Sequence, residues 1–165
     1  MEPVPFTADL STEVLDDLRS RLRGTRWPGT IGADDWVYGV PQAWLQDMVE
    51  YWAEEWDWSA QAEAMNAWQH YQVTIDGIPV HYLHAPARDS GAPPLVLTHG
   101  WPWTFWDFKD TIGPLSRPED YGGDAADAFN VYVPSLPGYG FSIPLTTAGV
   151  DVARVAELWV ALMTD

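Results

Sequence analysis

The residues best suited to chemistry follow a short apolar run near the middle of the chain. Pro94–Thr98 is apolar or β-prone and runs directly into His99, Gly100, Trp101 and Pro102. We interpret the run as a buried strand that ends in a glycine-containing turn. Such a turn leaves backbone N–H groups free at the carboxyl end of the strand, where open parallel sheets place their active sites. The sequence therefore predicts an oxyanion hole formed by free backbone N–H groups of this turn.

A nucleophile for covalent catalysis, by contrast, is not evident. A nucleophile elbow places its residue between a strand and a helix, and no Ser or Asp up to Asp165 has that context. Asp124 follows two glycines, but two alanines come after it and no apolar strand comes before it. We therefore predict that Asp124 is a solvated loop residue and that residues 1–165 carry no nucleophile.

The histidines are predicted to have structural roles. His99 could act as a general base, but a histidine fixed where a strand enters a turn more often supports the local backbone geometry. His81 and His84 are three residues apart in an expected strand, which puts their side chains on opposite faces. We therefore expect them not to share a metal ion, and the sequence implies neither a metal nor a cofactor.

Composition argues against several classes of partner. The 165 residues carry a formal net charge of -16, and the one lysine is Lys109. Binding to nucleic acid or to an anionic membrane needs clustered Lys and Arg, so we expect neither. Four arginines between positions 19 and 26 do cluster, but three of them fall in the last turn of an expected helix, where cations complement the helix dipole.

Nothing in the sequence indicates secretion or a membrane span. There is no cysteine, which excludes disulfides, thiolate metal sites and a cysteine nucleophile. The first six residues lack a basic region followed by an apolar stretch, and no window approaches the length of a membrane span. We expect a cytoplasmic protein, and the 47% hydrophobic content suits a globular domain with a core.

The first part of the chain, residues 1 to about 68, is predicted to be all-helical. Apolar residues recur about every fourth position in two stretches, and a third stretch is rich in alanine. The expected elements are a helix over residues 11–23 with Ser11 or Thr12 as N-cap and Gly24 at its end, a Trp-, Pro- and Gly-rich loop over Thr25–Gly39, a helix that starts near Pro41, and a helix over Ser59–Ala67.

Tryptophan is frequent in this chain, with eleven residues. Aromatic faces in such numbers can bind sugars or quaternary ammonium ions. However, Trp44, Trp52 and Trp56 lie at the spacing of one helix face, which favours packing in a core. We therefore predict that these tryptophans are core residues.

From about residue 69 the hydrophobic period changes from near four to two, which indicates strands. Two alternating runs flank Asp76-Gly77, a pair that favours a tight turn, so we predict a hairpin. Pro79 lacks an N–H and should lie at an edge or face outward. The remaining expected elements are strands over Leu95–Thr98 and Phe129–Val133, a helix that begins near Thr104, and a helix face between Val152 and Met163. This alternation predicts an α/β fold with parallel pairing.

Several segments rich in Trp, Gly and Pro occur in a characteristic order. They are Thr25-Arg26-Trp27-Pro28, Trp36-x-Tyr38-Gly39, Tyr51-Trp52 with Asp57-Trp58, Ile75-Asp76-Gly77, His99-Gly100-Trp101-Pro102, and Pro134-Ser135-Leu136-Pro137-Gly138-Tyr139-Gly140-Phe141-Ser142. Together they cover nearly the whole chain and resemble the microsomal-type epoxide hydrolases. The resemblance implies a helical N-terminal segment over residues 1–68 and the first half of an α/β-hydrolase core, with strands 1 to 4 and the following helix, over residues 69–165.

The resemblance also implies a two-step reaction. In that family an aspartate attacks an epoxide carbon to form an alkyl-enzyme ester, and a His-carboxylate pair then activates the water that releases a vicinal diol. Two tyrosines of a cap domain polarise the epoxide oxygen. By this resemblance all of these groups lie beyond Asp165, so we expect this chain to carry only the Trp101 N–H, placed by Gly100 and a cis Pro102, and to be inactive alone. The implied substrate of the completed enzyme is a small hydrophobic epoxide.

Two features leave the shape of the pocket open. The family usually has Gly-Ser after the proline of the turn, whereas this chain has Trp103-Thr104. The Trp103 ring either narrows the mouth of the pocket or points outward and changes nothing. The segment Pro134–Ser142 has enough Gly and Pro to be a rigid turn over a pocket, and a structural crossover loop is the equal alternative.

Two other classes of protein compete with this interpretation. The chain could be a non-catalytic interaction module, because the strand over Leu95–Thr98 is expected to lack a neighbour on one side, and an unpaired edge favours pairing with another chain. It could also be a different α/β-hydrolase, such as a dehalogenase or an esterase, since the oxyanion turn is widely shared. The helical N-terminal segment argues against the second class.

Overall fold

The computed structural model describes residues 2–29 and 35–164, and the chain separates into two compact units. The sheet unit comprises Met1–Ala8 and Ala64–Asp165, and the helical unit comprises Asp9–Glu63. Across the described ranges, no helix is both long enough and apolar enough to cross a membrane.

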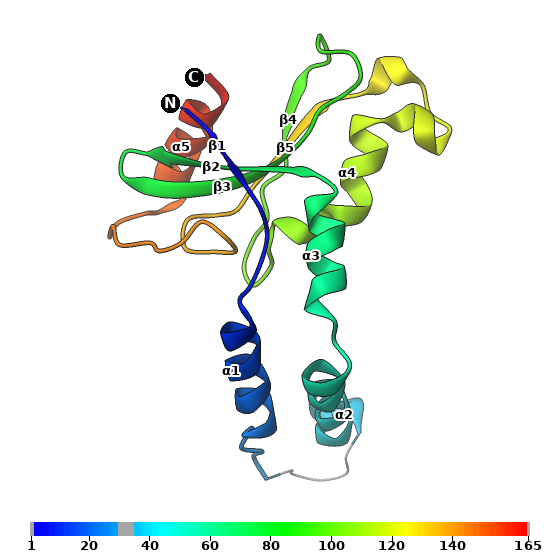
Figure 1. The fold of residues 1–165 in the computed structure, drawn as a ribbon, viewed down its shortest axis with the longest axis vertical. Coiled ribbons are helices and arrows are strands. Elements are labelled where there is room, and N and C mark those ends of the chain that lie inside the picture. The colour runs from blue at the N-terminus through cyan, green and yellow to red at the C-terminus, as the bar shows by residue number, and fades with distance from the viewer. Residues whose placement is uncertain (1, 30–34, 165) are drawn as a thin grey trace. The chain divides into compact units, whose positions relative to one another are not determined.

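The helical unit begins with α1, which spans Thr12–Arg23 (Figure 1). The helix starts where the sequence predicts, because the Ser11 side chain accepts a hydrogen bond from the Val14 N–H at 3.4 Å and so satisfies one of the unpaired amides of the first turn. It ends at Gly24, whose N–H donates to the carbonyl groups of the last turn. Both predicted caps of this helix are confirmed.

The second half of the helical unit contains α2, which spans Gln42–Glu54 and directly follows Pro41. The missing N–H of a proline costs nothing at this position, because the first amides of a helix have no partner inside it. A short 3-10 helix, Trp36–Tyr38, precedes α2. The loop expected over Thr25–Gly39 includes residues 30–34, which lie outside the described residues. The next helix, α3, spans Trp58–Asn66 and so passes from the helical unit into the sheet unit.

The prediction that Trp44, Trp52 and Trp56 are core residues was wrong. Their exposed fractions are 46%, 47% and 38%, respectively. Trp52 and Trp56 line an open apolar groove of about 480 Å³ in the helical unit, formed with α1 residues such as Leu15 and Leu18. Periodicity correctly found the apolar face of α2, but a unit of two long helices is one layer thick and cannot cover that face.

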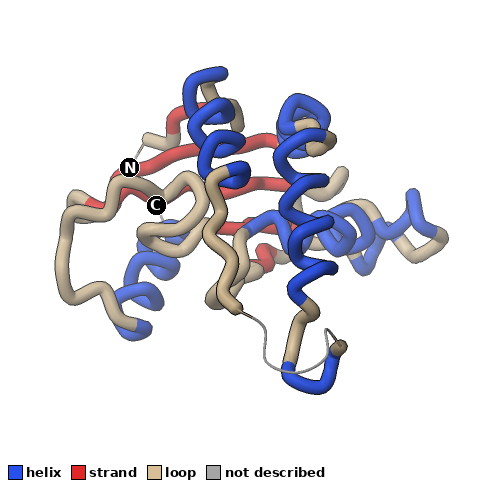
Figure 2. Tube along the Cα trace, turned by 90° about the horizontal axis from the view of Figure 1, so that it is seen from below, coloured by secondary structure: helices blue, strands red, loops and turns tan. Residues whose placement is uncertain are grey.

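The sheet unit is built on five strands in the order β1-β2-β3-β5-β4. The strands are β1 (Val4–Phe6), β2 (Gln69–Ile75), β3 (Ile78–Ala85), β4 (Pro94–Val96) and β5 (Asn130–Pro134). Neighbouring strands are antiparallel except β4 and β5, which are parallel as predicted. Figure 2 shows the strands as one layer, drawn in red.

The expectation of an all-helical segment over residues 1–68 was wrong at its start. Residues 4–6 form β1, which pairs antiparallel with β2 so that Phe6 lies opposite His70. A strand of three residues gives no detectable hydrophobic period, and Pro5 at its centre argues against a strand except at an edge, which is where β1 lies. The sheet unit therefore takes residues from both ends of the predicted helical segment.

The hairpin of β2 and β3 forms as predicted. Asp76 and Gly77 have φ angles of 50° and 79°, and Ile75 pairs with Ile78 across this two-residue turn. Pro79 pairs with Thr74 on one side, and β5 reaches β3 only from Tyr82 onward. At Pro79 the side of β3 that faces β5 farther along is unpaired among the described residues, so the missing N–H of the proline breaks no hydrogen bond to β5. This agrees with the prediction that Pro79 lies at an edge or faces outward.

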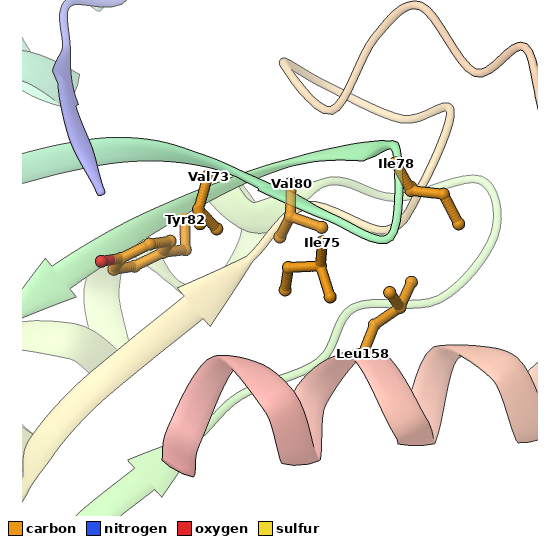
Figure 3. Close-up of a cluster of buried hydrophobic side chains, with 6 residues drawn as sticks. All are labelled: Val73, Ile75, Ile78, Val80, Tyr82 and Leu158. Carbon is orange, nitrogen blue, oxygen red and sulfur yellow. The ribbon is translucent and has the colours of Figure 1, made fainter. Parts of the chain in front are cut away.

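The helices that pack on the sheet follow β4 in the chain. The chain forms a 3-10 helix (Phe105–Phe108), α4 (Lys109–Ser116), two further 3-10 turns (Pro118–Tyr121 and Ala125–Asp127) and, after β5, α5 (Val152–Thr164). Figure 3 shows Leu158 of α5 against the hairpin, where it joins a buried cluster with five hairpin side chains, Val73, Ile75, Ile78, Val80 and Tyr82. Burial of a side chain such as Leu158 contributes about 1.5 to 3 kcal/mol. This core fixes the hairpin and α5, and thereby the strand ends that carry the candidate site.

Candidate oxyanion turn

The turn that the sequence singled out begins where the chain leaves the sheet. The Leu97 N–H donates to the Tyr132 carbonyl at 2.9 Å, which extends the pairing of β4 with β5 by one residue. The Trp103 N–H then donates to the Gly100 carbonyl at 2.9 Å and closes a tight turn. The Trp101-Pro102 peptide bond is cis, as predicted.

The Trp101 N–H lies in this turn and outside every strand ladder. Within the described part of the chain, no group accepts a hydrogen bond from it. A backbone amide that is free at the end of a strand is the type of donor that a developing oxyanion uses. The geometry therefore provides the predicted donor, and its use in catalysis stays a prediction.

His99 holds the turn with both of its ring nitrogens. The side chain is buried, Nε2 accepts a hydrogen bond from the Leu136 N–H at 3.0 Å, and Nδ1 lies 3.1 Å from the Gly100 carbonyl oxygen. Because Nε2 is an acceptor, the ring proton is on Nδ1, which donates to the carbonyl. Neither nitrogen remains to activate water, so this geometry supports a structural role for His99.

The same contact orients the candidate donor. The peptide group between Gly100 and Trp101 is planar, and its carbonyl and its N–H point in opposite directions. Two donors, the His99 ring and the Trp103 N–H, hold the carbonyl oxygen of Gly100. Fixing the direction of that carbonyl also fixes the direction of the Trp101 N–H.

A cavity of about 420 Å³ lies at the carboxyl ends of β4 and β5. Its lining includes Thr98, His99, Leu136, Tyr139, Val152 and Val155. Open α/β sheets bind ligands at this edge, and a mainly apolar lining suits an apolar ligand. Asp151 also lines the cavity, and its carboxylate accepts a hydrogen bond from the Arg154 N–H at 2.9 Å, close to the start of α5.

The residues that depart from the family pattern lie beside the turn. The Trp103 side chain is 61% exposed and lies outside the cavity lining that the described residues form, which favours the alternative that its ring points outward. The Thr104 hydroxyl accepts from the Trp106 N–H at 3.2 Å, while the Asp107 carboxylate accepts from the Thr104 N–H at 2.7 Å. This capping box starts the 3-10 helix that leads into α4, so the predicted helix start near Thr104 is confirmed.

Asp124 is an exposed loop residue, as predicted. Its Oδ1 accepts a hydrogen bond from the Ala126 N–H at 2.9 Å and caps a single 3-10 turn, Ala125–Asp127. The residue precedes β5 and does not follow a strand, so it is not placed as a nucleophile elbow requires.

The prediction that His81 and His84 occupy opposite faces of the sheet is confirmed. The His81 ring contacts the rings of Phe105 and Phe141, at centroid distances of 4.8 and 5.2 Å. The His84 ring stacks on Tyr132 at 4.4 Å, on the face that α5 covers. The two imidazoles therefore do not converge on one metal ion.

Sequence reasoning missed a buried pair on the His81 face. His70 Nδ1 lies 2.9 Å from His81 Nε2. The signal was available, because the Asp76-Gly77 turn fixes the register and places these two histidines diagonally on one face. Burial, with a smaller contribution from His70, lowers the pKa of His81 to about 3. Burial also lowers the pKa of His70, although the hydrogen bond to the Met65 carbonyl opposes that shift.

Comparisons with known proteins agree with the geometry. The family model "Epoxide hydrolase N terminus" matches residues 3–108. The chain is 32% identical over 163 residues to epoxide hydrolase 1 of Sus scrofa, an alignment that covers 96% of this chain and 36% of that protein. The structure of Aspergillus niger epoxide hydrolase matches with a TM-score of 0.84 at 28% identity, over 100% of this chain and 43% of the other.

A second solved structure gives the same result. Juvenile hormone epoxide hydrolase from the silkworm Bombyx mori matches with a TM-score of 0.83 at 28% identity, over 98% of this chain and 43% of that one. The expected first part of an α/β-hydrolase fold is therefore confirmed. The chain spans about a third of the length of the curated relatives it matches. With the family model matching most of its length, the chain belongs to the epoxide hydrolases through their N-terminal region.

Proposed function

We propose that this chain supplies the oxyanion donor of an epoxide hydrolase, which adds water to an epoxide and releases a vicinal diol through an alkyl-enzyme ester. The observation that carries the proposal is the Trp101 N–H, which has no acceptor among the described residues. It lies two residues after His99, and His99 lines the cavity at the carboxyl edge of the sheet. The nucleophilic aspartate, the cap tyrosines and the His-carboxylate pair would come from polypeptide beyond residues 1–165.

The Trp101 N–H would act in the second step of the reaction. Attack of an activated water on the ester carbonyl forms a tetrahedral intermediate whose oxygen carries a negative charge, and collapse of that intermediate breaks the acyl C–O bond and releases the diol. A donor aimed at this oxygen binds it more strongly as the charge develops, which lowers the barrier. One such donor contributes on the order of 3 kcal/mol.

The substrate class follows from the cavity. Aliphatic and aromatic side chains of the loop after β5 and of α5 form most of the lining. Such a lining binds an apolar substituent by removing it from water, and the turn supplies a polar N–H for the reacting oxygen. We therefore propose a small hydrophobic epoxide as substrate.

Diol formation tests the proposal. The protein encoded by the full reading frame that contains this chain should convert styrene oxide to phenylethanediol, and residues 1–165 alone should not, because they carry no nucleophile. Chromatography of the diol measures both reactions. A folded full-length protein that leaves alkyl and aryl epoxides unchanged would contradict the proposal, and diol formation by residues 1–165 alone would contradict the assignment of the nucleophile to later polypeptide.

The edge of the sheet favours a second candidate function, a module that pairs with a second copy of this chain. Among the described residues, β4 pairs only with β5, so its other edge presents unpaired backbone groups. Leu95 and Val96 of β4 are only half-buried. An open strand edge with apolar side chains favours pairing with another strand.

A single substitution tests this edge. The Leu97 N–H points toward β5, so the N–H of Val96, one residue earlier, points toward the open edge. Val96→Pro should therefore remove an outward donor without breaking the ladder to β5, and should convert an associated 165-residue chain to monomer in sedimentation velocity. Identical sedimentation of both chains as monomers would contradict the module.

A further inference from the structure

Three buried side chains form one hydrogen-bond chain on the face of the sheet opposite α5. We name His70, His81 and Ser135 the histidine relay. His70 Nε2 lies 2.8 Å from the Met65 carbonyl oxygen, His70 Nδ1 lies 2.9 Å from His81 Nε2, and His81 Nδ1 lies 2.9 Å from Ser135 Oγ. None of the three residues is more than 3% exposed, so water does not replace these partners.

The direction of every hydrogen bond in the relay is determined. The Met65 carbonyl can only accept, so His70 Nε2 carries a proton and His70 Nδ1 is an acceptor. His81 Nε2–H must then donate to His70, which leaves His81 Nδ1 to accept from the Ser135 hydroxyl. Burial lowers the pKa of both histidines and so favours neutral rings. For two neutral imidazoles, protons on both Nε2 atoms are the one assignment that satisfies every atom of the relay.

The relay holds the loop that follows β5. The Ser135 N–H donates to the His81 carbonyl at 2.8 Å. At the other end of the loop, the Ser142 hydroxyl accepts from the His81 N–H at 2.9 Å and donates to the Ser135 carbonyl at 2.8 Å. Both ends of the loop 135–142 are therefore attached to one residue of β3.

The loop in turn holds the oxyanion turn. Leu136 follows Ser135 directly, and its N–H donates to His99 Nε2. His99 then donates to the Gly100 carbonyl, whose peptide group also carries the Trp101 N–H. One continuous series of contacts thus leads from the relay to the candidate donor.

We propose that the histidine relay positions the Trp101 N–H for catalysis through the loop after β5 and His99. The proposal deepens the proposed function and rests on it for its catalytic meaning. His70, His81 and Ser135 are positioning residues, since none of them touches the reacting atoms. Their effect on the reaction is expected in the hydrolysis of the ester, where the N–H acts, and not in the formation of the ester.

The first test needs no substrate. In ¹⁵N NMR spectra of the 165-residue chain, His70 and His81 should carry their protons on Nε2 and His99 on Nδ1. Ser135→Ala removes the donor to His81 and should shift the Trp101 amide resonance. Ser116→Ala is the matched control, because Ser116 is equally buried but donates to the Ile112 carbonyl within α4, and it should leave the Trp101 amide in place.

The second test uses the full-length enzyme. Ser135→Ala should lower kcat by about 10- to 100-fold with little change in KM, because a displacement of about 1 Å at a catalytic group can cost about 10²-fold. The alkyl-enzyme ester should accumulate, since its formation does not use the Trp101 N–H. Ser116→Ala should lower the melting temperature comparably and leave kcat unchanged.

The result that would overturn the histidine relay differs from the result that would overturn the proposed epoxide hydrolase function. A proton on Nδ1 of His70 or His81 in the unmutated chain overturns the relay, and this measurement stands even if Ser135→Ala fails to fold. An unmoved Trp101 amide in folded Ser135→Ala, or equal kcat in the two serine variants, also overturns it. Absence of diol formation by the unmutated full-length protein contradicts the proposed function instead.

Discussion

Replacing the Trp101 amide by an ester should lower kcat for diol formation by about 10²- to 10³-fold in the full-length enzyme. The replacement introduces the α-hydroxy acid analogue of tryptophan, which exchanges the N–H for an oxygen and keeps the side chain. The N–H has no acceptor among the described residues, so its removal breaks no hydrogen bond of the fold. Steady-state rates of diol formation measure the effect.

Two further measurements separate this effect from a general disturbance. Rapid-quench mass spectrometry should find ester formation at its normal rate and ester hydrolysis slowed. Trp101→Phe keeps the N–H and changes a side chain that is 80% exposed, so its kcat should stay within about twofold of the unmutated enzyme. Equal slowing of both steps, or less than about threefold slowing of hydrolysis, would show that the Trp101 N–H is not the oxyanion donor.

Acid should destabilise the fold through the buried histidine pair. The pKa of His81 is lowered to about 3 from 6.5, so the unfolded chain binds a proton between these values and the folded chain does not. The stabilisation is fully present above about pH 6.5 and is lost as the pH falls toward about 3. Between pH 7 and pH 4.5, His81 alone should contribute a loss of about 2 to 3 kcal/mol in the free energy of unfolding.

The surroundings of His81 explain why it cannot retain a proton. The rings of Phe6, Phe105 and Phe141 pack against it, and its one titratable neighbour among the described contacts is His70. Both rings use Nδ1 as an acceptor, so protonation of either breaks a hydrogen bond as well as burying a charge. The lowered pKa of His70 acts in the same direction.

Urea unfolding of the 165-residue chain at pH 7 and pH 4.5 measures this loss. His81→Phe should be less stable than the unmutated chain at pH 7, because it leaves the partners of His81 unpaired at a cost of about 1 to 3 kcal/mol. It should lose less stability on acidification. Val80→Ala, at the adjacent and equally buried position, should lower the stability similarly at both pH values. An equal pH dependence in His81→Phe and the unmutated chain would refute the assignment.

Local signals predicted much of the fold. Ser11 and Gly24 mark the ends of α1, Asp76-Gly77 marks the hairpin, and Thr104 marks a helix start because each residue meets a need of the backbone within a few positions. The turn at His99–Pro102 was located for the same reason. Its place after a strand follows from the apolar residues before it, whereas its cis bond was expected from the family resemblance.

The features that were missed depend on distant residues. β1 is a strand only because β2, more than sixty positions later, pairs with it. Trp44 is exposed because the described part of the helical unit contains no further layer that could cover it. Periodicity within one helix cannot reveal whether such a layer exists. The contact of His81 with Ser135 joins β3 to the residue that follows β5, over a sequence separation of 54 residues. The hairpin register places His70 and His81 on one face of the sheet. It gives no information about the position of Ser135, which lies outside the hairpin.

The most direct test of the account is a crystal structure of the full-length enzyme with the ester intermediate trapped from a slowly hydrolysed epoxide. The account predicts that the Trp101 nitrogen lies about 2.7 to 3.1 Å from the ester carbonyl oxygen or the oxyanion that replaces it. It also predicts that His99 still donates to the Gly100 carbonyl. An ester oxygen held by other donors, with the Trp101 N–H turned toward solvent or bonded to a protein acceptor, would contradict it.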